Sequence, residues 1–397
     1  MTKKKLLALL MALVMCFALS ACKSSDADAS DSADPSESPS DSAEPTESEE
    51  IVADLSQTLY EFATGLKDDD AAATVNGTEI PNEQFLYWLA TDCYNVYSNY
   101  TQYYGIVPDF TDSELASYLL DDVKTAVTYY TVMREMCTEN GITVTDEQEA
   151  ELQQQIDDYE TENGEGSYQK LLQSYGLSED SFHYVYTNGF LYTNLADKLM
   201  GEPTEADLEQ YVTDKGIFSV KHILIQTTTS DQTDDDGNVT QTADEYNAEK
   251  KALAENLLAQ LQQSDDMETL FDSLMNEYSD DGRDDDGNLS YPDGYTFDED
   301  DSLIDGFREA SLALDVGELS DIVETDYGYH IILRLPVDAS NYHDDWISSG
   351  ADALVMERVE AADVTVSDDI TNLDIDSFYN RYTAYLTALY SETSSDK

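Results

Sequence analysis

Two segments rich in β-branched and aliphatic residues most constrain what this chain can fold into: 217–226 (IFSVKHILIQ) and 328–335 (GYHIILRL). Side chains of these types fill a packed, pleated surface, so both segments are predicted to be strands buried in a sheet. Each strand carries a histidine, His222 and His330, although the chain of 397 residues has only four. An imidazole in such a strand is either a core side chain with satisfied hydrogen bonds or part of a site.

The sequence between these strands predicts an α+β domain over residues 216–337. A polar, acidic loop (227–242) precedes a helix with Leu253, Leu257, Leu258 and Leu261 on one stripe, and a second helix ends at Asp281. A short strand (YTF, 295–297), a helix over 304–314 and a strand over 319–325 follow. The order β-α-α-β-α-β-β indicates a largely antiparallel sheet.

The flanking sequence reads as helical on both sides. Residues 71–215 begin with a short strand, an Asn76-Gly77 turn and a helix near Pro81, and helical spacing then recurs. Thr145 and Gln148 form a capping-box pattern. Five tyrosines lie within residues 94–104. They could contact another polypeptide, or they could be half-buried in the packing between helices.

The N-terminus predicts export and anchoring. Three lysines precede an apolar run (6–19) and the sequence LSAC, so residues 1–22 are interpreted as a signal peptide. LSAC resembles the bacterial lipobox, in which the cysteine, here Cys22, is diacylated; the alternative is an ordinary signal with a chance cysteine. Two acyl chains suffice for stable anchoring. We therefore expect an extracytoplasmic protein attached to the outer face of the cytoplasmic membrane.

Composition predicts a disordered acidic tether and excludes some partners. Residues 23–50 are mostly Ser, Asp, Glu, Ala and Pro, too polar to offset ordering entropy, and order is expected to resume within 51–70. With 85 acidic and 19 basic residues, the folded body is not expected to bind nucleic acid or anionic lipid. The remaining cysteines of the folded body, Cys93 and Cys137, allow at most one disulfide.

Several motifs carry a family resemblance. VKHILI, YSDD and DGFREASLALDVGELSDIVETDYGYHIILRL, over residues 216–337, resemble the parvulin peptidyl-prolyl isomerases. The lipobox with TVNGTEI, LSEDSFHYVY and PTEADLEQYV resembles the PrsA-type foldase lipoproteins, which are related to SurA. The resemblance implies a parvulin domain inserted between two helical segments, 71–215 and 338–397, which pack into one chaperone domain. It also implies unfolded or newly secreted proteins as clients; the oligomeric state is open, with a homodimer as one alternative.

The resemblance further implies a site without metal or cofactor. His222 and His330 match the family's tandem histidines, Thr325 belongs to their hydrogen-bond network, and Asp281 stands where the family has Cys or Asp. The residues that match the proline pocket are Leu289, Leu303 and Phe307.

The chemistry that this family performs explains these residue types. Rotating an X-Pro amide means crossing a barrier of about 18–20 kcal/mol without making or breaking a bond. A catalyst then needs an apolar cup to hold the proline ring and polar groups matched to the twisted amide. Three functions are weighed: an active foldase, a holdase whose parvulin domain has lost activity, and a solute-binding lipoprotein. The helical segment 71–215 argues against the two α/β lobes that the last requires.

Two features depart from the family. DDGNLSYPDG replaces the usual Gly-Gly-Asp-Leu-Gly run, and Leu303 replaces the usual Met.

The sequence DDDGN occurs twice, at 234–238 and 284–288. Neither copy is an EF-hand, because the residue at the first ligand position is unsuitable. Weak calcium binding and solvated turns are the two remaining interpretations. The loop 227–243 contains no Lys or Arg, which predicts an isomerase that does not need phosphate before proline.

Overall fold

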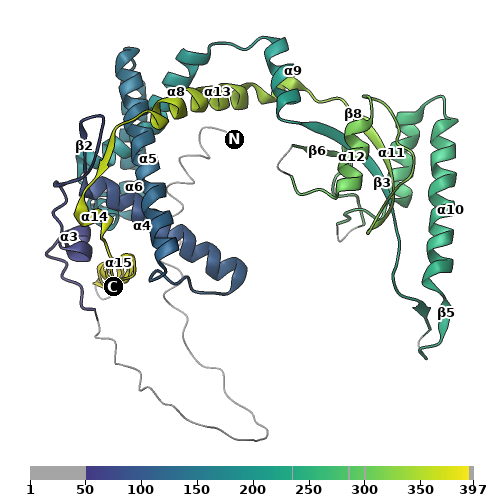
Figure 1. Cartoon of the computed structure of the whole chain (residues 1–397), viewed down its shortest axis with the longest axis horizontal. Coiled ribbons are helices and arrows are strands. Elements are labelled where there is room, and N and C mark those ends of the chain that lie inside the picture. The colour runs from purple at the N-terminus through teal and green to yellow at the C-terminus, as the bar shows by residue number, and fades with distance from the viewer. Residues whose placement is uncertain (1–50, 235, 285–286, 299–300, 393–397) are drawn as a thin grey trace, which may run out of the picture. The chain divides into compact units, whose positions relative to one another are not determined.

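The computed structural model describes residues 51–234, 236–284, 287–298 and 301–392. The chain divides into two compact units: 196–353, and a second unit formed by 1–195 together with 354–397 (Figure 1). Two long helices, α8 (Glu179–Met200) and α13 (His343–Glu360), contain the points of division. The prediction of an α+β domain inserted between helical segments is confirmed.

The inserted unit is built on a four-stranded antiparallel sheet with the order β6-β3-β8-β7. Strand β3 (Phe218–Gln226) lies between β6 (Tyr295–Phe297) and β8 (Gly328–Leu335), and β7 (Val323–Thr325) pairs with β8. The register places Leu224 opposite His330 and His222 opposite Ile332. Because paired residues share a face, both histidines lie on the same side of the sheet.

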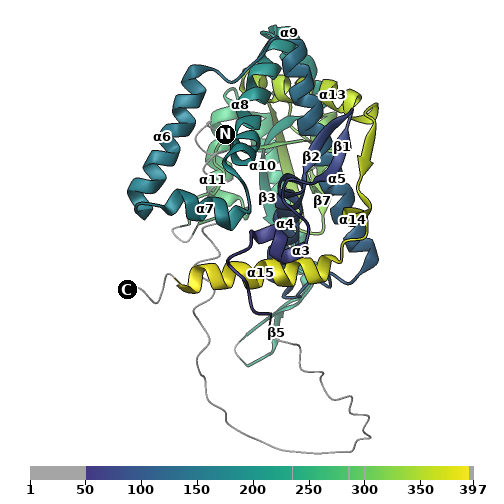
Figure 2. The same cartoon turned by 90° about the vertical axis from the view of Figure 1, so that its left-hand side faces the viewer.

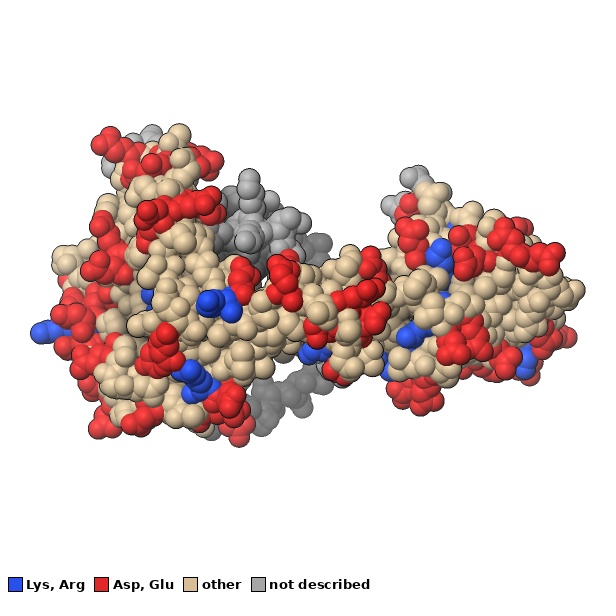
Figure 3. All heavy atoms as spheres, turned by 90° about the horizontal axis from the view of Figure 1, so that it is seen from above, with Lys and Arg blue, Asp and Glu red and all other residues tan. Residues whose placement is uncertain are grey.

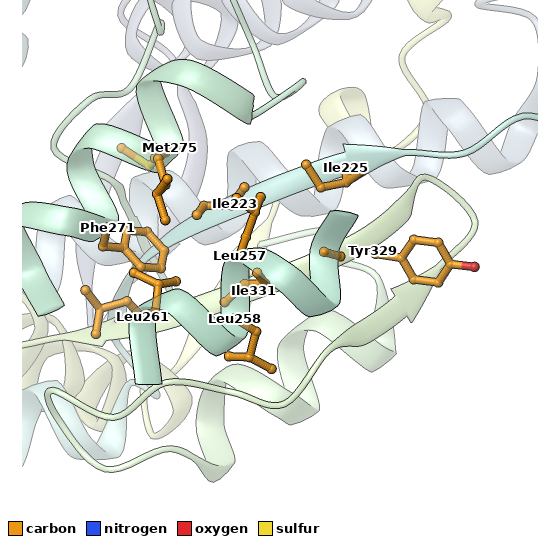
Figure 4. Packing of buried hydrophobic residues seen from close by; sticks show 12 residues of the cluster. Ile223, Ile225, Leu257, Leu258, Leu261, Phe271, Met275, Tyr329 and Ile331 are labelled. Carbon is orange, nitrogen blue, oxygen red and sulfur yellow. The ribbon is translucent and has the colours of Figure 1, made fainter. Parts of the chain in front are cut away.

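Helices cover the two faces of this sheet unequally. On one face, α10 (Ala243–Gln262) and α11 (Met267–Tyr278) pack Leu257, Leu261 and Phe271 against strand residues such as Ile223 and Ile331 (Figure 4). On the other face, the shorter helix α12 (Asp305–Ala313) packs Phe307 against Phe218, Val220 and Ile332. The histidines belong to this second face, where the short helix leaves room beside them.

The predicted element order is confirmed, with two additions. The acidic loop contains a small hairpin, β4 (Gln232–Thr233) and β5 (Val239–Gln241). Helix α9 (Glu205–Asp214) falls in the inserted unit, as does the 3₁₀ helix η2 (Ala339–Tyr342). This unit therefore begins earlier than residue 216, where the change from helical to strand periodicity places the predicted boundary.

The other unit joins both ends of the described chain. Strands β1 (Ala71–Val75) and β2 (Thr78–Pro81) form the predicted hairpin, with Asn76 at a positive φ of 49°, and β9 (Val364–Val366) pairs with β1 (Figure 2). Helices α4 (Asn82–Asn99) and α5 (Ser113–Glu139) pack against this sheet. The unit also contains α3 (Leu59–Thr64), the π-helix η1 (Tyr100–Tyr104), α6 (Asp146–Asn163), α7 (Ser167–Tyr175), α14 (Asp368–Thr371) and α15 (Ile375–Glu392).

The C-terminal helix α15 completes the core of this unit. Tyr385 on α15 is fully buried, and its hydroxyl donates a hydrogen bond to the carbonyl of Gln57. Arg381 donates to the carbonyl of Phe62 on α3. Helix α15 of the C-terminal segment thus packs against α3 near the start of the described residues.

The remaining expectations concern cysteines, the N-terminal segment, membrane spans and surface charge. Cys93 and Cys137 are both buried and free, so they do not form the disulfide that the sequence left open. Cys22 and the acidic segment 23–50 lie outside the described residues. None of the helices in the described part is both long and apolar enough to cross a bilayer. Asp and Glu outnumber Lys and Arg on the visible face of each unit (Figure 3).

Candidate active site

The two strand histidines contact each other directly. His222 and His330 project from the adjacent central strands β3 and β8, and their Nδ1 atoms are 3.1 Å apart. The two rings are 8% and 4% exposed and stack at an interplanar angle of 20°. A buried pair of this kind must satisfy its remaining ring nitrogens from the surrounding residues.

Asp281 satisfies the outer nitrogen of the first histidine. It follows α11, and its Oδ2 lies 3.1 Å from Nε2 of His222. The same oxygen accepts a hydrogen bond of 2.5 Å from the hydroxyl of Tyr295 on β6. The carboxylate is thus held from two strands at once.

Thr325 satisfies the outer nitrogen of the second histidine. Its Oγ1 lies 2.8 Å from Nε2 of His330 and accepts a hydrogen bond from the amide of Tyr327. Gly328, the first residue of β8, has a φ of 144°, and a Cβ there would lie 2.2 Å from the carbonyl oxygen of Ile225. Glycine therefore allows β8 to approach β3 closely where the histidine network begins.

The protons in this network have one consistent arrangement when Asp281 is ionised and both histidines are neutral. Asp281 can only accept, so His222 carries its proton on Nε2 and accepts at Nδ1. His330 then donates from Nδ1 and accepts at Nε2 from the Thr325 hydroxyl. Each hydrogen bond in this series is donated in the direction of Asp281. Each residue therefore fixes the tautomer of the neighbouring histidine.

The local electrostatics support this charge assignment. The hydrogen bond from His222 and the weaker effect of the one from Tyr295 together lower the pKa of Asp281 to about 2, against the opposing effect of burial. Burial and the neighbouring His222 lower the pKa of His330 to about 4. Burial and the hydrogen bond to Asp281 raise the pKa of Tyr295 above its usual range. At neutral pH the site therefore contains an ionised Asp281 and a neutral His330.

A cavity of about 380 Å³ opens beside this network. Phe307 contacts both imidazoles edge-on, with ring centroids 5.0 Å from His222 and 5.3 Å from His330. The apolar part of the cavity wall is formed by Leu224, Phe297, Leu303, Ile304 and Phe307. The polar part includes His222, His330, Asp281 and Tyr295. Apolar cups with a few convergent polar groups are typical of ligand sites.

The structure brings together most of the predicted site residues but not all. His222, His330, Asp281, Leu303 and Phe307 line the cavity, and Thr325 supports it from behind.

The structure places Leu289 away from the cavity, unlike the other residues predicted to bind proline. This residue forms a bridge with Arg283 and packs against the core cluster under α10 and α11, so it does not line the cavity. Arg283 also donates a hydrogen bond to the carbonyl of Gly287.

Tyr295 and Phe297 were missed by sequence reasoning. The only signal was strand periodicity: they pair with Val220 and Phe218, and so share the histidine face.

Phe307 is only 6% exposed, more buried than a rim residue of a binding site. Substituting it will therefore affect stability as well as the cavity.

Among the described residues, no cluster of three or more His, Cys, Asp or Glu side chains could hold a metal ion.

Comparison with known proteins identifies the inserted unit. Residues 208–334 match the family described as the PPIC-type PPIase domain. The chain is also similar to a PrsA peptidylprolyl isomerase from Bacillus cereus, at 18% identity over 80% of this chain and 99% of that chain with a TM-score of 0.30.

Two further solved structures are similar. The PrsA structure from Bacillus subtilis is 20% identical over 74% of this chain and 93% of that chain, with a TM-score of 0.22. A foldase protein PrsA from Lactococcus lactis is 16% identical over 78% and 99%, with a TM-score of 0.26. No curated protein matches the chain.

Proposed function

We propose that residues 208–334, which belong to the PPIC-type peptidyl-prolyl isomerase family, catalyse cis/trans isomerisation of X-Pro bonds in polypeptide clients. The observation that carries this proposal is the largely apolar cavity placed directly against the carboxylate of Asp281 and a buried histidine pair. Phe307, Leu303 and Phe297 would hold the proline ring. The polar wall would face the amide that precedes it.

The carboxylate gives this arrangement a physical route to catalysis. In a planar amide, resonance places partial negative charge on the oxygen, and twisting the C–N bond removes part of that charge. A fixed carboxylate beside the oxygen therefore disfavours the planar state more than the twisted one, which lowers the barrier. Tyr295 and His222 hold Asp281 in place and ionised, so its charge is present before the client binds.

A protease-free isomerisation assay on the full chain tests the proposal. Phe307→Ala should lower kcat/KM at least tenfold, equivalent to about 1.4 kcal/mol of transition-state binding. Leu274→Ala is the matched control, because Leu274 is equally buried, at 6% exposed, but lies in the core on the other face of the sheet. Full activity of a folded Phe307→Ala protein, or an equal loss in the control, would refute the assignment of the cavity.

A second function, holding unfolded clients without catalysis, is favoured by an exposed apolar patch on the other unit. Tyr103 and Tyr104 of η1 are 71% and 70% exposed, and Ile106 and Val107 follow them at 58% and 66%. Suppression of client aggregation by an inactive Asp281 variant would separate this activity from isomerisation. The two functions are compatible within one foldase.

We also propose that this foldase acts outside the cytoplasm, attached to the membrane through Cys22. The support is the lipobox-like sequence LSAC after a basic and then apolar leader. Cys22→Ser should move the protein from the membrane fraction to the medium, or leave the leader uncleaved. Unchanged, detergent-dependent membrane association of this variant would disprove the anchor.

A further inference from the structure

Strand β9 leaves one of its edges unpaired. It pairs with β1, and hydrogen bonds from Asn76 to the carbonyl of Asp363 and from Ser367 to the carbonyl of Ala72 flank the pairing. Backbone direction alternates along a strand, so the N–H and C=O groups of Val364 and Val366 point away from β1. These four groups have no hydrogen-bond partner in the described part of the chain.

A groove of about 590 Å³ adjoins this strand. One wall is the N-terminal half of α5, including Ala116 and Leu120, and the other is α14 with the residues that follow it, including Ile370 and Leu373. Val364, Thr365 and Val366 lie between the walls. Figure 2 shows the yellow strand β9 at the outer edge of the small sheet, close to α5 and α14.

We propose that this groove binds an extended segment of an unfolded polypeptide, which adds to β9 as a fourth strand. Only a polypeptide backbone offers donors and acceptors at the two-residue spacing that Val364 and Val366 present. Alternate side chains of the segment would pack on Leu120 and Leu373. The proposal goes beyond isomerisation, because it lies in the other unit and requires no proline.

Charge defines which segments fit. Lys124, the one basic residue that lines the groove, lies 3.8 Å from Asp121 and is partly neutralised by it. Asp363, Asp368 and Asp369 flank β9 and are exposed. The segment should therefore combine a β-branched centre with Lys or Arg at its ends. The acidic residues 23–50 of the chain itself have the opposite charge.

The test uses the full chain and a fluorescein-labelled peptide, Lys-Lys-Val-Thr-Val-Thr-Lys-Lys, with binding followed by fluorescence anisotropy. A matched peptide with N-methylated amides at alternate central residues keeps the side chains but blocks strand pairing. A second matched peptide replaces Lys with Glu. We expect the N-methylated peptide to bind at least tenfold more weakly, and the Glu peptide to bind more weakly at low salt than at high salt.

Two variants locate the site. Val366→Pro removes an outward N–H while leaving the β1 side of the strand intact, a position where an edge strand tolerates proline. Ala116→Phe fills the groove from α5 and does not alter β9. Each should weaken peptide binding at least tenfold without changing isomerisation of a proline peptide. Thr125→Phe, on an exposed part of α5 outside the groove, should bind like the wild type.

Several results would overturn the proposal. Equal affinity for the N-methylated peptide would exclude strand addition, and unchanged binding by Ala116→Phe would exclude the groove even if Val366→Pro fails to fold. Binding that appears only after removal of residues 1–50 would mean that the chain's own segment occupies the edge. A dimer that Val366→Pro dissociates, with no peptide bound by the wild type, would identify a second copy as the occupant.

Discussion

The hydroxyl of Tyr295 donates to the same carboxylate oxygen of Asp281 that faces His222. Tyr295 thereby acts through Asp281 and also lines the cavity itself. Two donors on one oxygen keep the carboxylate ionised although it is half-buried, and they prevent it from rotating. The charge that we assign to catalysis therefore depends on a residue from the short strand β6.

Tyr295→Phe should raise the pKa of Asp281, because it removes one of the hydrogen bonds that lower it. The acid limb of the pH profile of kcat/KM should then move to higher pH. At neutral pH Asp281 stays ionised, and a loss of up to about tenfold should come from freer rotation of the carboxylate. Tyr291→Phe is the control, because Tyr291 packs on Tyr295 at 4.5 Å and is 56% exposed. An acid limb that stays in place would show that Tyr295 only fills space.

Thr325→Val should disrupt the tautomers of both histidines. Without the hydroxyl, Nε2 of His330 has no donor, and a buried unpaired acceptor costs about 1–3 kcal/mol. Moving the proton to Nε2 would place two acceptors 3.1 Å apart between the imidazoles. Nitrogen NMR should show altered His222 and His330 tautomers together with reduced kcat/KM, and Thr325→Ser should restore both. Wild-type tautomers in the valine variant would disprove the directed network.

His330 should make the inserted unit less stable in acid. Its pKa is lowered from the ordinary 6.5 to about 4, so the unfolded chain takes up a proton between these pH values that the folded protein does not. The free energy of unfolding therefore falls as the pH is lowered from about 6.5 to about 4, by roughly 3 kcal/mol for this group alone. Urea unfolding across this range should show a smaller pH dependence for His330→Asn than for the wild type. An NMR titration that gives His330 an ordinary pKa would contradict the prediction.

Much of the inserted unit could be predicted because its central strands carry their own signal. The apolar runs around His222 and His330 predicted β3 and β8, and the helical stripe of Leu257 and Leu261 predicted α10. Leu289 could not be placed, since its bridge with Arg283 and its packing under α10 and α11 are tertiary contacts that leave no local pattern. Tyr295 gained its role only from its pairing with β3, 75 residues earlier in the chain at Val220.

The pairing of β9 with β1 could not be predicted from the local sequence, for a similar reason. Three residues, Val364 to Val366, are too short a run to distinguish a strand from a loop. Their partner lies in the hairpin near the start of the described chain, and only tertiary packing brings the two together.

A phosphate before proline should hinder the isomerase. The cavity wall, within the part of the chain that the structure describes, contains Asp280 and Asp281 but no Lys or Arg. A phosphate dianion would meet like charge without a basic partner. Matched Ser-Pro, phospho-Ser-Pro, Glu-Pro and Lys-Pro peptides should show slowest turnover for the phosphorylated one, and the difference should shrink at high salt. A preference for phospho-Ser-Pro would overturn this prediction, and equal rates would show that these carboxylates lie too far from the residue before proline to influence it.

One unit is inserted in the sequence of the other, and this determines the order in which the two can fold during synthesis. The inserted unit is one continuous stretch, 196–353, so all its strands are available once that stretch has been made. The other unit needs β9 to finish its sheet and α15 to finish its core, and both come from the last residues of the chain. Closing contacts over some 290 residues is slow in comparison with local pairing. A chain produced from its N-terminus should thus complete the inserted unit first, and stop codons placed after residue 353 should leave a folded inserted unit without a finished helical unit.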